Sequence, residues 1–438
     1  MKRWPTGGLW RHPDFVKLWS AQTVSQVGTQ FTQLALPLVA IDVVHASAFE
    51  VALLTTVEFL PFLLVSLPAG VWVDRLRRRP ILIAGDISRA LLLVSVPIAY
   101  WSGSVTMAQL YVVGFLAGIG TVFFDVAYQS YLPSLVERQQ LIDGNAKLEI
   151  SRAGAQLGGP GLAGLVIDLL KAPAAIAFDA VSFVGSALFI FGIRREERTE
   201  PAPPRRRMRE ELREGLRYVL THPFLKNIAA CTALFNLFGN LGFAVLLVFA
   251  RRELHLSPLA IGLALTLANV GALLAAFNAS RISSRFGVGR TIVGTAILGG
   301  PMFLVIPFAP EGNAALAVLV PAFAIGGLAN VIYNVTQVSL RQAITPERIQ
   351  GRMNAVMRFI VWGTIPLGAL IGGVLASRIG VKNTLIVGGI GSCLPFLPVF
   401  FSPVRDIKEM PEPVDEAAAV LEPLVADAAP LPAEHLGT

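Results

Sequence analysis

Residues 70–79 read Gly70-Val-Trp-Val-Asp74-Arg75-Leu-Arg77-Arg78-Arg79. This stretch stands between two apolar runs, near residues 51–73 and 80–101. Lys and Arg gathered beside apolar runs mark the cytoplasmic loops of membrane proteins. The arginines therefore indicate a cytoplasmic loop that joins two membrane-spanning helices. Topology alone does not explain Gly70 and Asp74, which lie one helical turn apart just before the arginines.

Apolar runs of this kind fill most of the chain. Of the 438 residues, 54% are hydrophobic and only 15% are charged, which indicates that lipid is the main solvent. A helix needs roughly 20 apolar residues to cross about 30 Å of hydrocarbon. We therefore predict an all-α membrane protein with twelve transmembrane helices. They are expected near residues 15–41, 51–73, 80–101, 107–131, 145–170, 173–193, 224–250, 257–280, 289–309, 313–338, 353–377 and 383–402.

The basic residues are distributed unevenly between the two sides of the membrane. With the N-terminus inside, 24 of the 36 Lys and Arg fall in cytoplasmic segments and 5 in external ones, and the other 7 lie within spans. We therefore expect a cell-membrane protein with both termini in the cytoplasm. The same clustering between apolar runs argues against nucleic acid as a partner. The first span carries four glutamines, so it is too polar for a cleavable signal peptide and should stay in the mature protein.

The chain divides at a polar segment near its middle. Residues 194–223 contain a Pro-Arg stretch and then an amphipathic pattern, which predicts a cytoplasmic linker with a short helix. This linker separates an N-terminal six-helix half, residues 1–193, from a C-terminal half, residues 224–403. Residues 404–438 are rich in Ala, Pro and Glu and have little apolar surface to offset the entropy of ordering. We expect them to form a disordered cytoplasmic tail.

The two halves share an internal repeat at an offset of 209 residues. At this offset Glu149 falls on Arg358, and five small or amide residues find identical partners: Asn145, Ala146, Gly154, Gly159 and Gly164 fall on Asn354, Ala355, Gly363, Gly368 and Gly373. An even number of spans in each half keeps both repeats in the same orientation. We therefore predict parallel repeats about an axis along the membrane normal.

Two motifs carry a resemblance to a known family. Residues 70–79 resemble the signature loop of the major facilitator superfamily. The fifth span reads Gly154-Ala-Gln-Leu-Gly158-Gly159-Pro160-Gly161-Leu-Ala-Gly164, which is similar to the motif of that superfamily's antiporters. Over about residues 10–403 the chain looks most like the twelve-span drug and siderophore exporters, which include macrolide efflux and enterobactin export proteins. Close helix packing alone would also favour small residues in the fifth span.

The resemblance implies the major facilitator fold and roles for the two motifs. Gly70, Asp74, Arg75 and Arg78 would belong to a cytoplasmic latch between the halves in the outward-facing state. Gly154, Gly158, Gly159, Pro160 and Gly164 would form the antiporter-type motif. One departure is notable, because the family's fourth-span motif often carries an Arg before a Gly. The matching stretch here, Gly114-Phe-Leu-Ala-Gly118, has no arginine.

Polar side chains inside the spans should face a cavity or a partner helix, because hydrocarbon offers them no hydrogen bonds. By the resemblance, the first, fourth, seventh and tenth spans line a central cavity. Gln22, Gln26, Gln30 and Gln33 are spaced to lie on one helical face. A stripe of hydrogen bonds between helices would also explain them. The cavity candidates are Gln26, Gln30, Gln33, Tyr128, Gln129, Asn236, Asn240, Asn330 and Asn334.

Three carboxylates within the spans are candidates for proton coupling. Glu58 lies roughly 14 Å deep in the second span, close to the membrane midplane, and ranks first. Asp125 lies near the cytoplasmic end of the fourth span, and Asp179 lies in the outer third of the sixth. Each of the three could instead be paired structurally. Asp86 and Arg89 in the third span are spaced as a structural ion pair.

The chain lacks the motifs of several other function classes. It has no Gly-x-x-x-x-Gly-Lys-Ser/Thr phosphate loop, which argues against ATP hydrolysis. The five histidines lie in loops, at the ends of spans or in the tail, and the two cysteines lie far apart. We therefore expect no metal site, no cofactor and no enzymatic activity.

These observations predict a monomeric secondary transporter in the lipid bilayer. The leading hypothesis is a proton-coupled exporter of a hydrophobic or amphipathic small molecule, such as a drug, antibiotic or siderophore, that works by alternating access. One alternative is an importer or symporter of a polar nutrient, which would more often place several charges in its cavity. The other is a receptor or scaffold that transports nothing. Transport assays would discriminate among them.

Overall fold

The computed structural model describes residues 8–73, 76–137, 140–195 and 208–411. All regular elements of these residues are helical. In the first half they are α1 (Pro13–Asp42), α2 (Ala48–Leu64), α3 (Ser66–Val73), α4 (Arg78–Trp101), α5 (Met107–Leu135), α6 (Leu141–Leu170) and α7 (Ala172–Phe191). Then follow α8 (Met208–Thr221), α9 (Leu225–Arg252), α10 (Pro258–Phe286), α11 (Val288–Leu304), α12 (Leu316–Ala343), α13 (Glu347–Ile379), α14 (Val381–Ser392) and α15 (Phe396–Phe400). Short 3-10 turns, η1 (Leu9–Arg11), η3 (Ile306–Phe308), η4 (Gly312–Ala315) and η5 (Pro403–Asp406), flank them.

Some of the long helices begin at a residue whose side chain caps them. Ser47 accepts from the backbone N–H of Glu50, and the Glu50 carboxylate accepts from Ser47 in return, which completes a capping box at the start of α2. The Thr106 side chain accepts from the Gln109 N–H at the start of α5, and the Ser257 side chain accepts from the Ala260 N–H at the start of α10. Within hydrocarbon every backbone polar group needs an internal partner, so long uninterrupted helices are the stable solution for these apolar runs.

Ten helices of the described residues are long and apolar enough to cross a membrane. The protein is therefore a multi-pass membrane protein. Two further stretches that the sequence predicts as spans correspond to α1 and to α2 with α3. The four glutamines make α1 more polar than the ten, and α2 has only 17 residues before the chain breaks at Val65 and continues as α3. The count of twelve stays a prediction.

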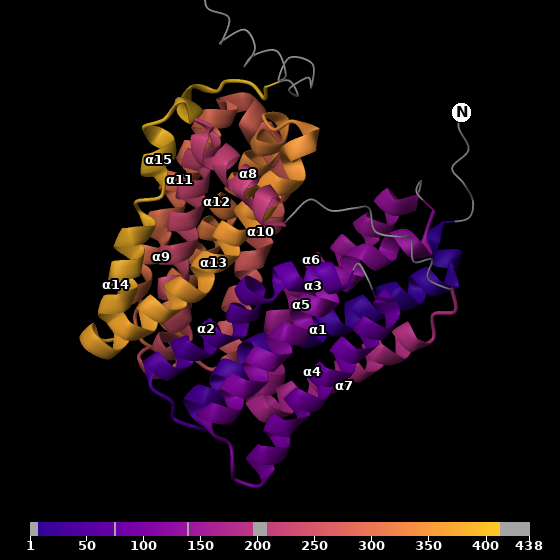
Figure 1. Cartoon of the computed structure of the whole chain (residues 1–438). Coiled ribbons are helices and arrows are strands. Elements are labelled where there is room, and N and C mark those ends of the chain that lie inside the picture. The colour runs from indigo at the N-terminus through magenta and orange to yellow at the C-terminus, as the bar shows by residue number, and fades with distance from the viewer. Residues whose placement is uncertain (1–7, 74–75, 138–139, 196–207, 412–438) are drawn as a thin grey trace, which may run out of the picture.

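The helices form two bundles that converge at one end of the molecule (Figure 1). Helices α1 to α7 make the first bundle, with α1 packed against α6 and α7 and α4 against α5 and α7. Helices α9 to α15 make the second bundle, in which α10 and α11 pack on α12 and α9 packs on α13 and α14. The bundles meet through two main helix pairs, α2 with α13 and α6 with α10.

Two segments at the bundle margins pack on the second half. The linker helix α8 lies on α13, where Glu214 pairs with Arg352 at 2.5 Å and the Tyr218 hydroxyl donates to the Ile344 carbonyl at 3.2 Å. Residues 404–411, which the sequence assigns to the tail, are ordered. Val404 is fully buried, and the carbonyl of residue 407 accepts from the Gly289 N–H at 2.8 Å. The tail from residue 412 and residues 196–207 of the linker lie outside the described residues.

Candidate functional site

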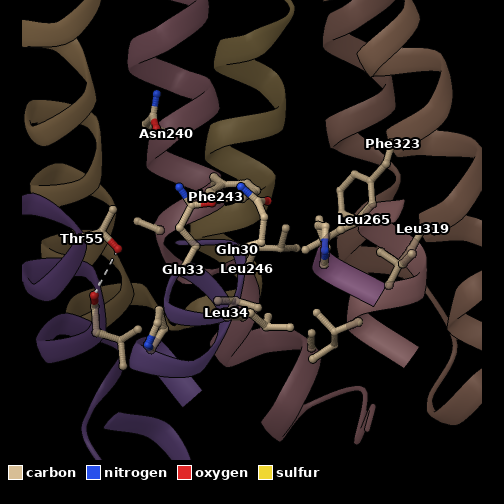
Figure 2. Close-up of a pocket in the computed structure, with 18 of the residues that line it drawn as sticks. Gln30, Gln33, Leu34, Thr55, Asn240, Phe243, Leu246, Leu265, Leu319 and Phe323 are labelled. Carbon is tan, nitrogen blue, oxygen red and sulfur yellow. Dashed lines mark hydrogen bonds between the residues drawn. The ribbon is translucent and has the colours of Figure 1, made fainter. Parts of the chain in front are cut away.

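A cavity of about 270 Å³ lies between the two bundles. Helices α1 and α2 wall it on one side and α9, α10 and α12 on the other. Figure 2 shows Gln30 and Gln33 of α1 among Phe243, Leu246 and the side chains of α10 and α12. Most of the wall is apolar: Leu34, Phe59, Phe243, Leu246, Leu265, Leu319 and Phe323 contribute to it. A cavity of this kind, apolar with a few polar groups, suits a small molecule with an apolar body.

The polar groups of this cavity come mainly from α1, α2 and α9. Gln30, Gln33, Thr55, Glu58 and Asn240 line it. The Asn240 amide donates to the Asn236 carbonyl of its own helix at 2.8 Å, which leaves its side-chain oxygen as an acceptor. Among the described residues, no hydrogen bond or ion pair engages the Glu58 carboxylate. Glu58 is therefore the one acidic group of an otherwise neutral cavity.

The end of the cavity where the bundles converge is closed by the loops before α2 and α10. The Arg251 guanidinium of α9 makes two hydrogen bonds to the Asp42 carboxylate of α1, at 3.2 and 2.9 Å. Arg252 donates to the Ala46 carbonyl at 2.6 Å, and Arg251 also donates to Leu256 at 2.5 Å. The contacts of Arg251 with Asp42 and of Arg252 with Ala46 join the two bundles, whereas the contact of Arg251 with Leu256 lies within the second bundle.

Next to these loops, small residues of α6 and α10 let the two bundles approach closely. A Cβ added to Gly164 of α6 would overlap the Pro258 carbonyl oxygen of α10, and one added to Gly262 would overlap the Pro160 carbonyl oxygen. The Gly161 N–H donates to Thr266 at 3.0 Å. Of the antiporter-type motif, Gly164 and Pro160 lie in this contact with α10, Gly159 packs on Gln30, and Gly154 and Gly158 face open space.

At the opposite end the bundles are separated by a cleft of about 460 Å³. Asp125 and Gln129 of α5 line one side, and Asn354 and Arg358 of α13 line the other. The positive charges of Arg89, Arg152 and Arg358 act on the Asp125 carboxylate. An aromatic layer borders this cleft, because Phe62 of α2 stacks on Trp362 of α13 with ring centroids 4.5 Å apart.

The structure brings together only some of the residues that the sequence predicts. Gln30, Gln33, Asn240 and Glu58 share the enclosed cavity, while Gln129 and Asp125 share the cleft. The other five cavity candidates, all described residues, line neither: they are Gln26, Tyr128, Asn236, Asn330 and Asn334. Asn334 instead accepts from Gln337 at 2.9 Å, and Tyr128 stacks on Phe124.

The predicted latch is described only at its margins. Gly70 lies in α3 and Arg78 begins α4, whereas Asp74 and Arg75 lie outside the described residues. Glu149, the repeat counterpart of Arg358, pairs with Arg152 of its own helix at 2.7 Å. This salt bridge between Glu149 and Arg152 therefore joins neighbouring turns of α6 and does not connect the two repeats.

Arg89 is the residue whose place sequence reasoning did not anticipate. The spacing predicts a pair with Asp86, and the structure has that pair at 2.5 Å. Arg89 also lines a second cavity of about 160 Å³ inside the first bundle, together with Glu58 and Asp179. Glu58 lines both cavities and so stands between them. The sequence does contain one sign of this place, because a basic residue in the middle of an apolar run indicates a cavity or a partner within the membrane.

Comparisons with known proteins agree with this architecture. A family model described as transmembrane secretion effector matches residues 8–429. The multidrug efflux pump Tap of Mycolicibacterium fortuitum is 28% identical over 86% of this chain and 92% of the pump. Macrolide efflux protein A of Streptococcus pyogenes is 24% identical over 86% and 92%. Among solved structures, a bacterial homologue of the iron transporter ferroportin in an inward-facing state matches with a TM-score of 0.73 at 19% identity, over 90% of this chain and 99% of that one.

Proposed function

This chain belongs to the transmembrane secretion effectors of the major facilitator superfamily, and we propose that it is a proton-coupled exporter of a hydrophobic or amphipathic small molecule. It is a membrane transporter and not an enzyme. One observation carries the proposal. The cavity between the bundles is mostly apolar, is closed at one end, and contains one carboxylate without a partner among the described residues.

The chemistry of the cavity supports the class of cargo. Aromatic and aliphatic side chains would cover an apolar body, and Gln30, Gln33 and Asn240 would orient a few polar groups on it. Most polar groups of a polar nutrient would find no hydrogen-bonding partner on this wall, so the importer hypothesis is the weaker one. Export as the direction is supported by the relatives that are named as efflux proteins.

Alternating access between two repeats is supported by contacts that recur at the sequence offset. The offset of 209 places α6 on α13 and α2 on α10, so the contact of α6 with α10 corresponds to that of α13 with α2. Asp42 and Arg251, which bind each other across the bundles, also stand 209 residues apart. Rocking of one bundle against the other would break these contacts and close the cleft at the opposite end.

Proton coupling is assigned to the carboxylates, with Glu58 ranked first. A carboxylate without a cation is costly near the membrane midplane, so Glu58 should be protonated in at least one conformation. The predicted latch at residues 70–78, the cytoplasmic termini, the plasma membrane and the monomeric state complete the proposal.

Transport by the purified full-length chain in proteoliposomes tests the proposal. A panel of lipophilic antibiotics and siderophores is offered with and without an imposed pH gradient. We expect accumulation of at least one compound that is driven by the gradient. Uptake of polar nutrients alone would favour the importer, and binding of a compound without flux would favour the receptor.

A further inference from the structure

We propose that Arg89 is the shared counter-charge of the proton site, a positioning residue that decides which neighbouring carboxylate holds the proton. The inference deepens the proposed function and rests on it. It differs from the sequence prediction, in which Arg89 serves only as the structural partner of Asp86. The observation behind it is that one buried guanidinium faces more carboxylates than it can neutralise.

The guanidinium of Arg89 is held in the middle of the first bundle. Its Nη2 donates to Asp86 at 2.5 Å, and its Nε donates to the Gly85 carbonyl at 3.2 Å. Its carbon atom lies over the Phe183 ring of α7 at 4.0 Å and over the Phe124 ring of α5 at 4.6 Å. Among the residues that the structure describes, the remaining nitrogen, Nη1, has one hydrogen-bonding contact, a long one of 3.5 Å to Thr121. One end of the guanidinium is therefore committed to Asp86, and the other end has a weak partner.

The weakly bound end belongs to a cavity that holds two of the proton-coupling candidates. Arg89 and Thr121 line the 160 Å³ cavity, and so do Glu58 of α2 and Asp179 of α7. One water molecule occupies about 30 Å³ in the liquid, so a few waters fit among these groups. A proton could therefore pass between Glu58 and Asp179 without entering the cargo cavity.

The charges of this region do not balance if every carboxylate is ionised. Asp86 is 0%, Asp179 1% and Arg89 5% exposed. Asp179 accepts from the Ser182 hydroxyl at 3.0 Å, a neutral donor. An uncompensated charge is costly where the side chains are so little exposed to solvent, and one guanidinium compensates one carboxylate. One of the two buried aspartates must therefore hold a proton.

The groups facing Arg89 come from four helices. Asp86 lies on its own helix, Glu58 on α2 and Asp179 on α7, and the charge of Arg89 also acts on Asp125 of α5. Arg152 and Arg358 act on Asp125 as well, which makes Asp125 the least dependent of the three candidates on Arg89. Movement of the guanidinium from Asp86 toward the cavity would release a proton from Asp179 or Glu58.

Helix α5 provides the space that Arg89 occupies. A Cβ added to Gly120 would lie 3.0 Å from the Arg89 Cγ, so any larger side chain there would press on the arginine stem. A Cβ at Gly118 would lie 2.7 Å from the Glu58 carbonyl oxygen. Gly118 and Gly120 of α5 therefore leave room for α2 at Glu58 and for the stem of Arg89.

The test is a pH titration of buried carboxyls by infrared spectroscopy on the full-length chain in lipid. Asp179→Asn and Glu58→Gln assign the carbonyl bands of the protonated groups. The decisive variant is the double substitution Asp86→Asn with Arg89→Gln, which removes a cation and an anion together and so avoids stranding either charge. We expect its remaining protonated band to persist to a pH about one unit or more above that of the wild type. Asp86→Asn alone should move the band the other way, because it frees Arg89 for the cavity.

The control is the pair Asp143 and Lys147 of α6, whose salt bridge of 2.5 Å lies away from this cavity. Asp143→Asn with Lys147→Gln should leave the bands unchanged, and Arg89→Lys should largely restore the wild-type titration. If the double variant at Asp86 and Arg89 titrates like the wild type, Arg89 is a structural partner only and the inference is wrong. A wild type that titrates as expected but shows no gradient-driven efflux would overturn the proposed function alone.

Discussion

At the scale of single residues, few charges lie within the bundles, and their surroundings differ. Asp86 forms a salt bridge with Arg89. Asp125 lines the cleft and interacts electrostatically with three arginines. Glu58 has no hydrogen-bonding or ionic partner among the described residues and borders two cavities. The sequence ranks Glu58 first by its depth in the second span. Its place between the cavity of the two bundles and the cavity that Arg89 and Asp179 line gives that ranking a geometric reason.

Glu58→Gln should stop or uncouple gradient-driven efflux while cargo binding stays within a few-fold of the wild type. The amide keeps the size and most of the hydrogen bonding of the carboxyl group, but it carries no proton. Efflux and equilibrium binding are measured on the same purified preparation. Asp125→Asn is the comparison. If Glu58→Gln keeps full efflux while Asp125→Asn loses it, the proton site belongs on α5.

At the scale of elements, the contact between α6 and α10 depends on the absence of side chains. Gly164 lies against the Pro258 backbone, and Gly154 of the same motif faces open space. The motif therefore contains positions with different roles. Packing explains Gly164 and Gly159, whereas the structure offers no contact that explains Gly154 or Gly158.

Gly164→Leu should impair transport strongly, and Gly154→Leu should have little effect. Forcing a side chain into a close backbone contact typically costs about 1–3 kcal/mol, and here the cost falls on the conformation in which α6 and α10 touch. Efflux rates and the amount of folded protein after purification are compared. Equal losses of efflux in both variants would show that the motif acts by something other than this contact.

The Asp42–Arg251 pair should contribute modestly to closure of the converged end. Both side chains are partly exposed, and such pairs are worth at most about 1 kcal/mol, or a few-fold in population. Asp42→Arg should therefore change the efflux rate more than Asp42→Asn, because it adds repulsion. The exchanged pair, Asp42→Arg with Arg251→Asp, should recover most of the loss. Failure of the exchange to recover any efflux would mean that the ion pair is not the cause.

At the scale of the whole molecule, the two bundles touch at one end and enclose a cleft at the other. The converged end bears the loops at residues 43–47 and 253–257. The end with the cleft bears the linker helix α8 and the ordered part of the tail. The charge asymmetry of the sequence assigns the second end to the cytoplasm, which would make the conformation inward-facing.

Reporter fusions test that orientation. A reporter that is active only in the cytoplasm should be active after Thr438 and inactive when inserted at residue 255, in the loop before α10. The expectation follows from the 24 to 5 distribution of Lys and Arg between cytoplasmic and external segments. The opposite pattern of activity would invert the molecule in the membrane and reverse the proposed direction of access.

The sequence by itself determined the helical membrane architecture, the boundaries of most helices and the family. These follow from the length and polarity of local runs and from short motifs, which are properties of neighbouring residues. It also identified the acids within the spans, because a carboxylate in an apolar run differs from its neighbours in the sequence whichever way its side chain points.

Only the tertiary structure decided which of these residues share a cavity. Gln30 of α1 and Asn240 of α9 line the same cavity from opposite bundles, while Asn330 and Asn334 carry the same kind of amide side chain but line neither that cavity nor the cleft. The sequence predicts an ion pair between Arg89 and Asp86, three residues away, and does not identify further partners. The structure adds neighbours of Arg89 from α2, α5 and α7. The physical reason is that spacing along one helix defines a face, whereas the partner of that face depends on how the helices pack around one another.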